Sequence, residues 1–219
     1  MKTPLQVDYY TDVLCVWAWI AQRRIDELEQ EQGDNICIRH HCINVFGDTT
    51  SRIGDGWSDR GGYAGYAAHV QEAAAPYEFA PVNVAIWRDV RPFTSATAHL
   101  VLKAAEILTA ADDSRALALA LRKHFFVDGL DIGDQRVVLD SAGEAGFDIP
   151  GLTALIDSGQ AMAALMSDYG DAKNLGLKGS PSLVLNEGRQ VLYGNVGYRI
   201  LNANIKELLK RPVSEASWC

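Results

Sequence analysis

The stretch DYYTDVLCVWA, residues 8–18, joins a strand pattern to a helix pattern through a cysteine. Before the cysteine, apolar and polar residues alternate over residues 5–10, which predicts a short strand. After it, apolar residues recur at helical spacing over residues 16–32, and Gly33 follows as a helix stop signal. Residues 36–45 predict a second strand. The order predicts a βαβ unit with a right-handed crossover.

Cys15 is predicted to lie at the carboxyl end of the first strand and at the start of the helix. Open α/β sheets bind ligands at that end, and the N–H groups and dipole of a helix N-terminus favour a thiolate over a thiol. The alternative is a free cysteine buried as a small hydrophobe. We predict that Cys15 is reactive. Asp12 is expected to point to solvent or to help cap the turn; if it came close, its charge would raise the thiol pKa.

A second motif is KGSPS, residues 178–182, just before a predicted strand. Pro181 suits the first residue of a strand, because proline cannot donate to a sheet ladder. If the Ser180–Pro181 bond is cis, Ser180 presents free backbone N–H and C=O groups to an extended ligand. The alternative is a plain strand-initiating proline. Residues 182–186 and 190–193 then predict a β-hairpin, and a last helix ends near Pro212.

The middle of the chain has a different character. Residues 47–65 are rich in Gly, Asp, Ser and Thr, which predicts a long surface loop or mobile lid. Residues 81–92, between two prolines, are expected to be extended or irregular. Helical patterns are predicted over residues 66–75, 95–111, 114–127, 134–145, 150–158 and 161–175.

Composition and charge limit the functional classes. With 219 residues, 48% of them hydrophobic, the chain has the make-up of one large globular domain or of a domain with an insertion. A net charge of -8 without a basic patch disfavours nucleic acid as a partner. The sequence lacks a long apolar run and an apolar signal core, so we expect a cytoplasmic protein without a membrane span.

The cysteines and histidines point to neither a disulfide nor a metal site. A structural disulfide is improbable in a reducing cytoplasm, and Cys37 and Cys42 are predicted to face opposite sides of a strand. The sequence contains no CxxC pair. His40, His41 and Cys42 are adjacent in a strand, so neighbours face opposite ways and a metal site there is not expected.

Residues 8–18 and 179–181 together resemble the thioredoxin superfamily and, more narrowly, the DsbA-like family. That family includes FrnE-type oxidoreductases, 2-hydroxychromene-2-carboxylate isomerases and kappa-class glutathione transferases. The likeness covers nearly the whole chain, because residues 95–99 and 124–132 resemble the family's helical insertion. It implies an α/β, thioredoxin-like fold, β-α-β…β-β-α, with an inserted all-helical domain. It also implies that Pro181 is a cis proline facing Cys15.

The resemblance implies a division of the chain into a discontinuous thioredoxin-like domain and an insertion. The first comprises residues 1–46 and 176–212, the insertion comprises residues 47–175, and residues 213–219 form a C-terminal tail. Relatives in the transferase branch imply a homodimer.

One position departs from the oxidoreductase pattern. Those family members carry a second cysteine three residues after the first, where this chain has Ala18. A dithiol cycle needs that resolving thiol. In the isomerase and transferase branches, a serine usually stands at the Cys15 position, and glutathione lies along the cis-proline loop. The chain therefore resembles the oxidoreductases at Cys15 and the isomerase and transferase branches at Ala18.

Three functions remain open at this point. The first is a thiol-dependent oxidoreductase in which Cys15 attacks a disulfide and external glutathione resolves the adduct. The second is a glutathione-dependent isomerase or transferase, in which glutathione bound at Ser180 and Pro181 attacks a small organic electrophile. Trp17 and Trp19 would line the substrate cavity, or else pack in the core. The third is a non-catalytic, thioredoxin-fold binding protein, such as a peptide adaptor or chaperone.

Overall fold

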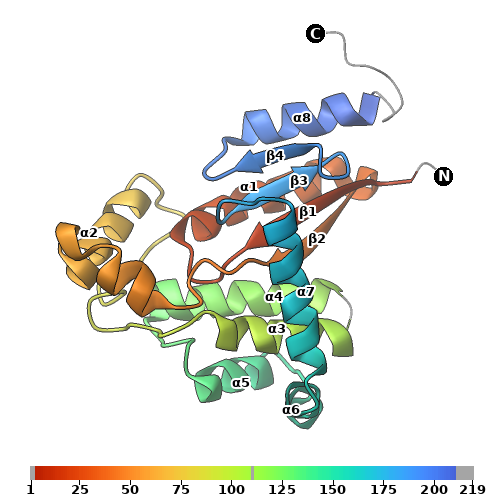
Figure 1. Ribbon diagram of the computed structural model, residues 1–219. Coiled ribbons are helices and arrows are strands. Elements are labelled where there is room, and N and C mark those ends of the chain that lie inside the picture. Colours follow the sequence, from red (N-terminus) through yellow and green to blue (C-terminus); the bar gives the residue numbers. More distant parts are fainter. Residues whose placement is uncertain (1–2, 110, 211–219) are drawn as a thin grey trace.

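A computed structural model describes residues 3–109 and 111–210 of the chain (Figure 1). Its sheet has four strands in the order β2-β1-β3-β4. The first two strands are parallel, and the other two neighbouring pairs are antiparallel. The strands are β1 (Leu5–Thr11), β2 (Ile36–Cys42), β3 (Ser182–Leu185) and β4 (Gln190–Tyr193). This mixed sheet with its flanking helices confirms the predicted α/β fold class.

Helices cover both faces of the sheet. On one face, α1 (Val16–Gln32) and α8 (Tyr198–Lys210) enclose a core that includes Val7 and Tyr9 of β1. On the other face, α7 (Gln160–Asn174) packs Ala172 against Tyr10 and Val184. This alternation along β1 follows from the two-residue period of a strand.

The remaining helices lie between β2 and β3 in the sequence. Figure 1 shows α3 to α6 together on the side of the sheet away from α8. Their core also contains Val16 and Trp19 of α1, so the helical layer and the start of α1 share one apolar interior. The helices are α2 (Gly62–Ala74), α3 (Ala96–Leu108), α4 (Ala111–Lys123), α5 (Gln135–Glu144) and α6 (Ile149–Asp157).

The prediction of a loop over residues 47–65 is wrong. The segment contains a π-helical turn (Thr50–Asp55), a 3-10 turn (Ser58–Arg60) and the start of α2. Asp48 accepts a hydrogen bond from the Ser51 backbone at the start of the first turn, and Ile53 is fully buried. A single apolar residue among polar ones gives no periodic signal, although it anchors the turn in the core.

Other boundaries also differ from the predictions. β2 ends at Cys42 and not near Val45, because the Val45 N–H donates to the carboxylate of Asp12 and not to a neighbouring strand. The helix predicted over residues 114–127 is α4 followed by a separate π-helical turn, His124–Asp128. α1 and β4 begin and end where the sequence predicts.

Some predictions fall outside the described residues. They concern Pro212 as the end of the last helix, the tail over residues 213–219, and Cys219. Among the residues that the structure describes, no helix is both long enough and apolar enough to span a membrane.

Candidate active site

Cys15 is the N-cap residue of α1, directly after the turn that follows β1. Its N–H donates to the Asp12 carbonyl at 3.1 Å, and its own carbonyl accepts hydrogen bonds from the N–H groups of Ala18 and Trp19. The Sγ atom donates to the backbone carbonyl of Ser180 at 3.2 Å. The structure thus brings together Cys15 and the loop before β3, which are 165 residues apart in sequence.

The surroundings of Cys15 do not favour the thiolate that the sequence predicts. The residue is only 5% exposed, and burial raises the pKa of its thiol from the ordinary 9.0. The Ser180 side chain and the N–H groups of Ala18 and Trp17 oppose this shift, and the charge of Asp12 adds to it. The cost of desolvating the thiolate outweighs the stabilisation that the N-terminus of α1 gives to the thiolate. Cys15 is therefore a protonated thiol at neutral pH.

Ser180 and Pro181 are joined by a cis peptide bond, the form that the resemblance implies. Both residues are buried, and Ser180 is 6% exposed. The expectation that Ser180 offers a free carbonyl is wrong, because that carbonyl accepts from Cys15. The Ser180 hydroxyl in turn accepts from the Asp12 N–H at 2.9 Å. A ligand that used the Ser180 carbonyl would share it with the Cys15 thiol or replace that thiol, because a carbonyl oxygen can accept two hydrogen bonds.

Asp12 does not point to solvent. It is fully buried, and its Oδ1 accepts from the N–H of Leu14, which fits the predicted turn cap. Its Oδ2 accepts from the N–H groups of Val45 and Phe46 at 3.0 and 2.9 Å, and from the Ser95 hydroxyl at 2.8 Å. One carboxylate therefore ties the Cys15 turn to the end of β2 and to the start of α3.

His99 connects the Cys15 turn to α7. The residue is fully buried, and burial lowers its pKa, so the imidazole is neutral. Its Nε2 accepts from the Val13 N–H at 3.3 Å, which leaves Nδ1 to donate to the Tyr169 hydroxyl at 2.8 Å. Both ring nitrogens of His99 are therefore engaged in hydrogen bonds within the core.

A groove of about 380 Å³ runs beside the cis-proline loop. Its wall carries three cations, Arg52, Lys173 and Lys178, and none of its described lining residues is acidic. Tyr169 and Gly179 also line it, so the groove adjoins both the His99 pair and the residue before Ser180. Such a groove suits an elongated anionic molecule.

Cys15 and the cis-proline loop both lie within a long segment that matches the sequence profile of a known domain family. The profile of the DSBA-like thioredoxin domain matches residues 6–206. The chain belongs to this family.

Solved structures support the fold of this DSBA-like chain. A probable DsbA oxidoreductase from Streptomyces coelicolor has a TM-score of 0.75 at 18% identity, with 98% of this chain and 93% of that one covered. The cytosolic disulfide reductase DsbM from Pseudomonas aeruginosa, solved with GSH, has a TM-score of 0.71 at 22% identity, with coverage of 94% and 100%. A 2-hydroxychromene-2-carboxylate isomerase has a TM-score of 0.67 at 18% identity, with coverage of 94% and 97%.

A curated relative has another role. The ClpXP adapter protein SpxH from Halalkalibacterium halodurans is 25% identical over 220 residues, which cover 95% of this chain and 69% of the relative.

The two tryptophans of the DSBA-like motif differ in their surroundings. Trp19 is 7% exposed, stacks on Phe126 at 6.0 Å between ring centroids, and donates from Nε1 to the Pro81 carbonyl. Trp19 packs in the core, which is the alternative to a place in the substrate cavity that the sequence leaves open. Trp17 is half-buried against the same core. Neither residue lines the groove beside the cis-proline loop.

The described cysteines other than Cys15 do not form disulfides. Cys37 is exposed, whereas Cys42 is buried, in line with the predicted opposite orientations on β2. Burial raises the pKa of Cys42 well above its ordinary value. Position 18, where a resolving cysteine would stand, carries the buried side chain of Ala18.

Sequence reasoning missed the connecting residues of the site. A lone Asp12, His99 or Tyr169 has no local pattern that reveals a partner far away in the chain. Arg52 lies in a segment that the sequence predicts to be a loop, so nothing in the sequence indicates that it lines a groove. Only the position of Asp12, three residues before Cys15, hinted that its charge would matter.

Proposed function

We propose that this DSBA-like chain is a glutathione-linked thiol oxidoreductase with Cys15 as its single redox cysteine. The observation that carries the proposal is the 3.2 Å contact between Cys15 Sγ and the Ser180 carbonyl, at the N-terminus of α1. The thiol is fixed in position, and a thiolate formed there faces the N–H groups of Trp17 and Ala18. A ligand that displaces the Ser180 contact would expose the sulfur at the same time.

Glutathione is the proposed co-substrate because of charge and position. It is a short peptide with two carboxylates, and the groove beside Gly179 carries Arg52, Lys173 and Lys178. The DsbM neighbour, named as a cytosolic disulfide reductase and solved with GSH, supports the same choice and a cytoplasmic location. The homodimer and the absence of nucleic-acid partners stay predictions.

The proposed reaction exchanges one disulfide for another. The Cys15 thiolate attacks the glutathione sulfur of a substrate–glutathione mixed disulfide, and the substrate leaves as a thiolate that takes up a proton. A second glutathione thiolate attacks the Cys15–glutathione disulfide, which releases Cys15 and oxidised glutathione. The substrate sulfur is reduced, and glutathione is oxidised. Cys15 ends in its starting state, so Ala18 needs no thiol.

The proposal is tested with oxidised glutathione and a glutathionylated peptide. We expect intact-mass analysis to find one glutathionyl group on Cys15, and peptide release to depend on added glutathione. Cys15→Ser should lower release by at least about a thousandfold, as expected for loss of a nucleophile. Cys37→Ser, which changes an exposed cysteine, is the matched control and should leave the rate unchanged. Unmodified Cys15 at alkaline pH would contradict the proposal.

A glutathione-dependent isomerase or transferase is favoured by one observation, the burial of Cys15, which raises the pKa of its thiol. In that reaction the Cys15 thiol would donate a hydrogen bond to a bound glutathione thiolate, which attacks a small organic electrophile. A serine hydroxyl can donate in the same way. Retention of glutathione-dependent turnover by Cys15→Ser would therefore favour this function over the oxidoreductase.

A peptide-binding adaptor is favoured by the match to the SpxH adapter across 95% of the chain, together with the burial of Cys15. This function needs no reactive sulfur. Cys15→Ala would leave peptide binding unchanged in an adaptor, and neither glutathionylation nor turnover would be measurable in the wild-type protein.

A further inference from the structure

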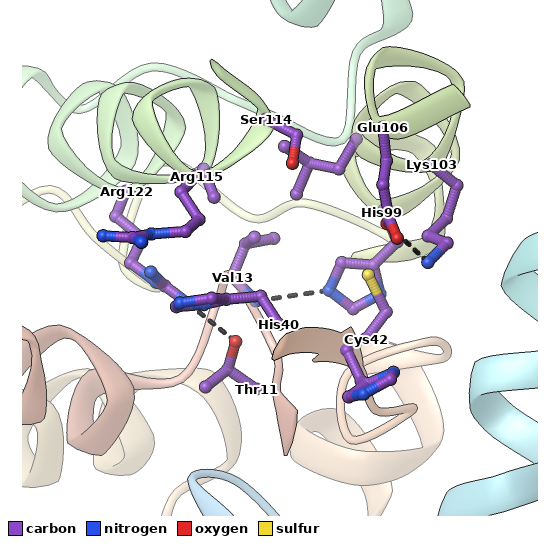
Figure 2. Close-up of a pocket in the computed structure, with 13 residues that line it drawn as sticks. Thr11, Val13, His40, Cys42, His99, Lys103, Glu106, Ser114, Arg115 and Arg122 are labelled. Atoms are coloured by element: carbon purple, nitrogen blue, oxygen red, sulfur yellow. Dashed lines mark hydrogen bonds and ion pairs between the residues drawn. The ribbon is translucent and has the colours of Figure 1, made fainter. Parts of the chain in front are cut away.

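A second cavity lies at the carboxyl ends of β1 and β2, beneath α3 and α4 (Figure 2). Its volume is about 40 Å³, and Cys15 does not line it. In Figure 2, Thr11, His40 and Arg122 gather on one side, whereas Cys42, His99 and Lys103 lie on the other. The carboxyl ends of parallel strands are where open α/β sheets bind ligands.

Arg122 is a buried cation that has no carboxylate partner among the residues that the structure describes. It is 2% exposed, and its Nη1 and Nη2 donate to the Gln22 side chain at 3.0 Å and the Thr11 hydroxyl at 2.8 Å, both neutral. Its buried Nε has no hydrogen-bond partner among the described residues. Buried guanidinium groups are usually paired, because an uncompensated charge is costly to desolvate.

The other cations of the cavity wall are compensated. Lys103 contacts Glu106 at 2.6 Å and Asp168 at 3.1 Å. Arg115, on the same helix as Arg122, contacts Glu29 at 2.6 Å. The unmatched positive charge is therefore specific to Arg122 and is not a general property of this wall.

His40 supplies a second unmatched polar atom on the same side of the cavity. Its Nε2 is buried and has no hydrogen-bond partner among the described residues. Its ring packs edge-on against Tyr9, with 5.5 Å between the ring centroids. Burial lowers the pKa of His40 to about 3, and the charges of Arg115 and Arg122 add to this shift. A neutral imidazole can carry its proton on Nε2 and donate it. With its proton on Nε2, His40 adds a second free donor to the unpartnered Nε of Arg122.

We propose that this cavity binds a single small oxyanion, and specifically a carboxylate group, between Arg122 Nε and His40 Nε2. A carboxylate neutralises the guanidinium and accepts from both donors. The size agrees, because about 40 Å³ accommodates roughly three water-sized groups, and a carboxylate has three heavy atoms. The ligand would be a small organic acid or the carboxylate of a larger molecule that enters the cavity.

The experiment titrates the full-length protein with sodium acetate, and separately with phosphate and chloride, at constant ionic strength. Binding is followed by the imidazole ¹⁵N resonances of labelled histidine. We expect the His40 resonances to move with acetate in a saturable way, and binding to weaken at least tenfold in Arg122→Gln. Arg136→Gln removes the same charge from an exposed side chain that pairs with Asp134, so it should bind as the wild type does.

His40→Phe keeps an aromatic ring against Tyr9 and leaves Arg122 in place, so it tests the site even if Arg122→Gln does not fold. Acetate binding to His40→Phe, measured by calorimetry, should weaken at least threefold. Equal effects of acetate and chloride on the wild type, or equal acetate affinity in the wild type and the folded variants, would overturn the proposal. Tighter binding of phosphate than of acetate would overturn the assignment to a carboxylate.

Discussion

The two buried polar clusters at the carboxyl ends of β1 and β2 differ in how their hydrogen bonds are satisfied. In the first, the carboxylate of Asp12 accepts from three backbone N–H groups and one hydroxyl, and Cys15 is bonded to Ser180. In the second, Arg122 and His40 retain free donors among the described residues. The described chain supplies the hydrogen-bond partners of Asp12 and Cys15. The free donors of Arg122 and His40 would be satisfied only by a ligand. Buried polar groups normally have hydrogen-bond partners. The difference therefore distinguishes a site that the chain itself preorganises from a site that binds a ligand.

The largest expected effect is on the first cluster. Asp12→Ala removes the acceptor of four hydrogen bonds at once, three of them buried, and we expect it to lower the free energy of unfolding by about 3–5 kcal/mol. Asp134→Ala removes an exposed N-cap of α5 and should cost about 1 kcal/mol, so it serves as the control. Urea denaturation measures both. Equal losses would mean that the Asp12 cluster is no more important than an ordinary helix cap.

The pH dependence of Cys15 reactivity is the next largest effect. Because the folded-state pKa is raised, the thiolate fraction is small at pH 7 and increases about tenfold per pH unit until the pKa is reached. Alkylation by iodoacetamide, followed by peptide mass analysis, should therefore increase steeply from pH 7 to 9. In the unfolded chain the pKa is lower, so deprotonation stabilises the unfolded state first, and stability should decrease at alkaline pH. A rate that is already constant at pH 7 would contradict the assigned protonation state.

The same comparison explains what the sequence could predict. The alternation before Cys15, the helix after it and the hairpin after Pro181 are local patterns, and they located the sheet and the two halves of the Cys15 site. The thiolate prediction rests on a helix N-terminus, which is visible in the sequence. The burial of the sulfur, which opposes a thiolate, depends on how α1 packs against distant helices.

The second cluster gave almost no sequence signal. Arg122 lies in an ordinary helical pattern, and an arginine there is most often exposed. His40 was considered only as a metal ligand next to His41. They line the same cavity only because the fold brings residues of α4 and β2 to it, which no local periodicity specifies. Whether a polar atom lacks a hydrogen-bond partner can be seen only in the folded structure and not in the sequence.

Ser180→Ala tests whether the first cluster tunes the thiol. The change removes the acceptor of the Asp12 N–H and a side chain that lowers the Cys15 pKa. We expect a loss of about 1–2 kcal/mol in stability, and slower alkylation of Cys15 at pH 8. Ser182→Ala, which removes a buried hydroxyl bonded to the Gly179 carbonyl, should cost similar stability without changing Cys15. Identical alkylation rates in the two variants would show that Ser180 does not tune the thiol.

The smallest expected effect is at the second cluster without added ligand. Arg122→Met removes a buried charge for which residues 3–109 and 111–210 provide no carboxylate partner, so the relief of desolvation offsets the two lost hydrogen bonds. We expect stability in chloride buffer to change by less than about 1 kcal/mol, far below the loss for Asp12→Ala. Acetate should then stabilise the wild type and not the variant, because only a state that binds the ligand gains from mass action. A large loss in chloride buffer, unchanged by acetate, would mean that Arg122 is satisfied by Thr11 and Gln22 alone, and the contrast between the two clusters would disappear.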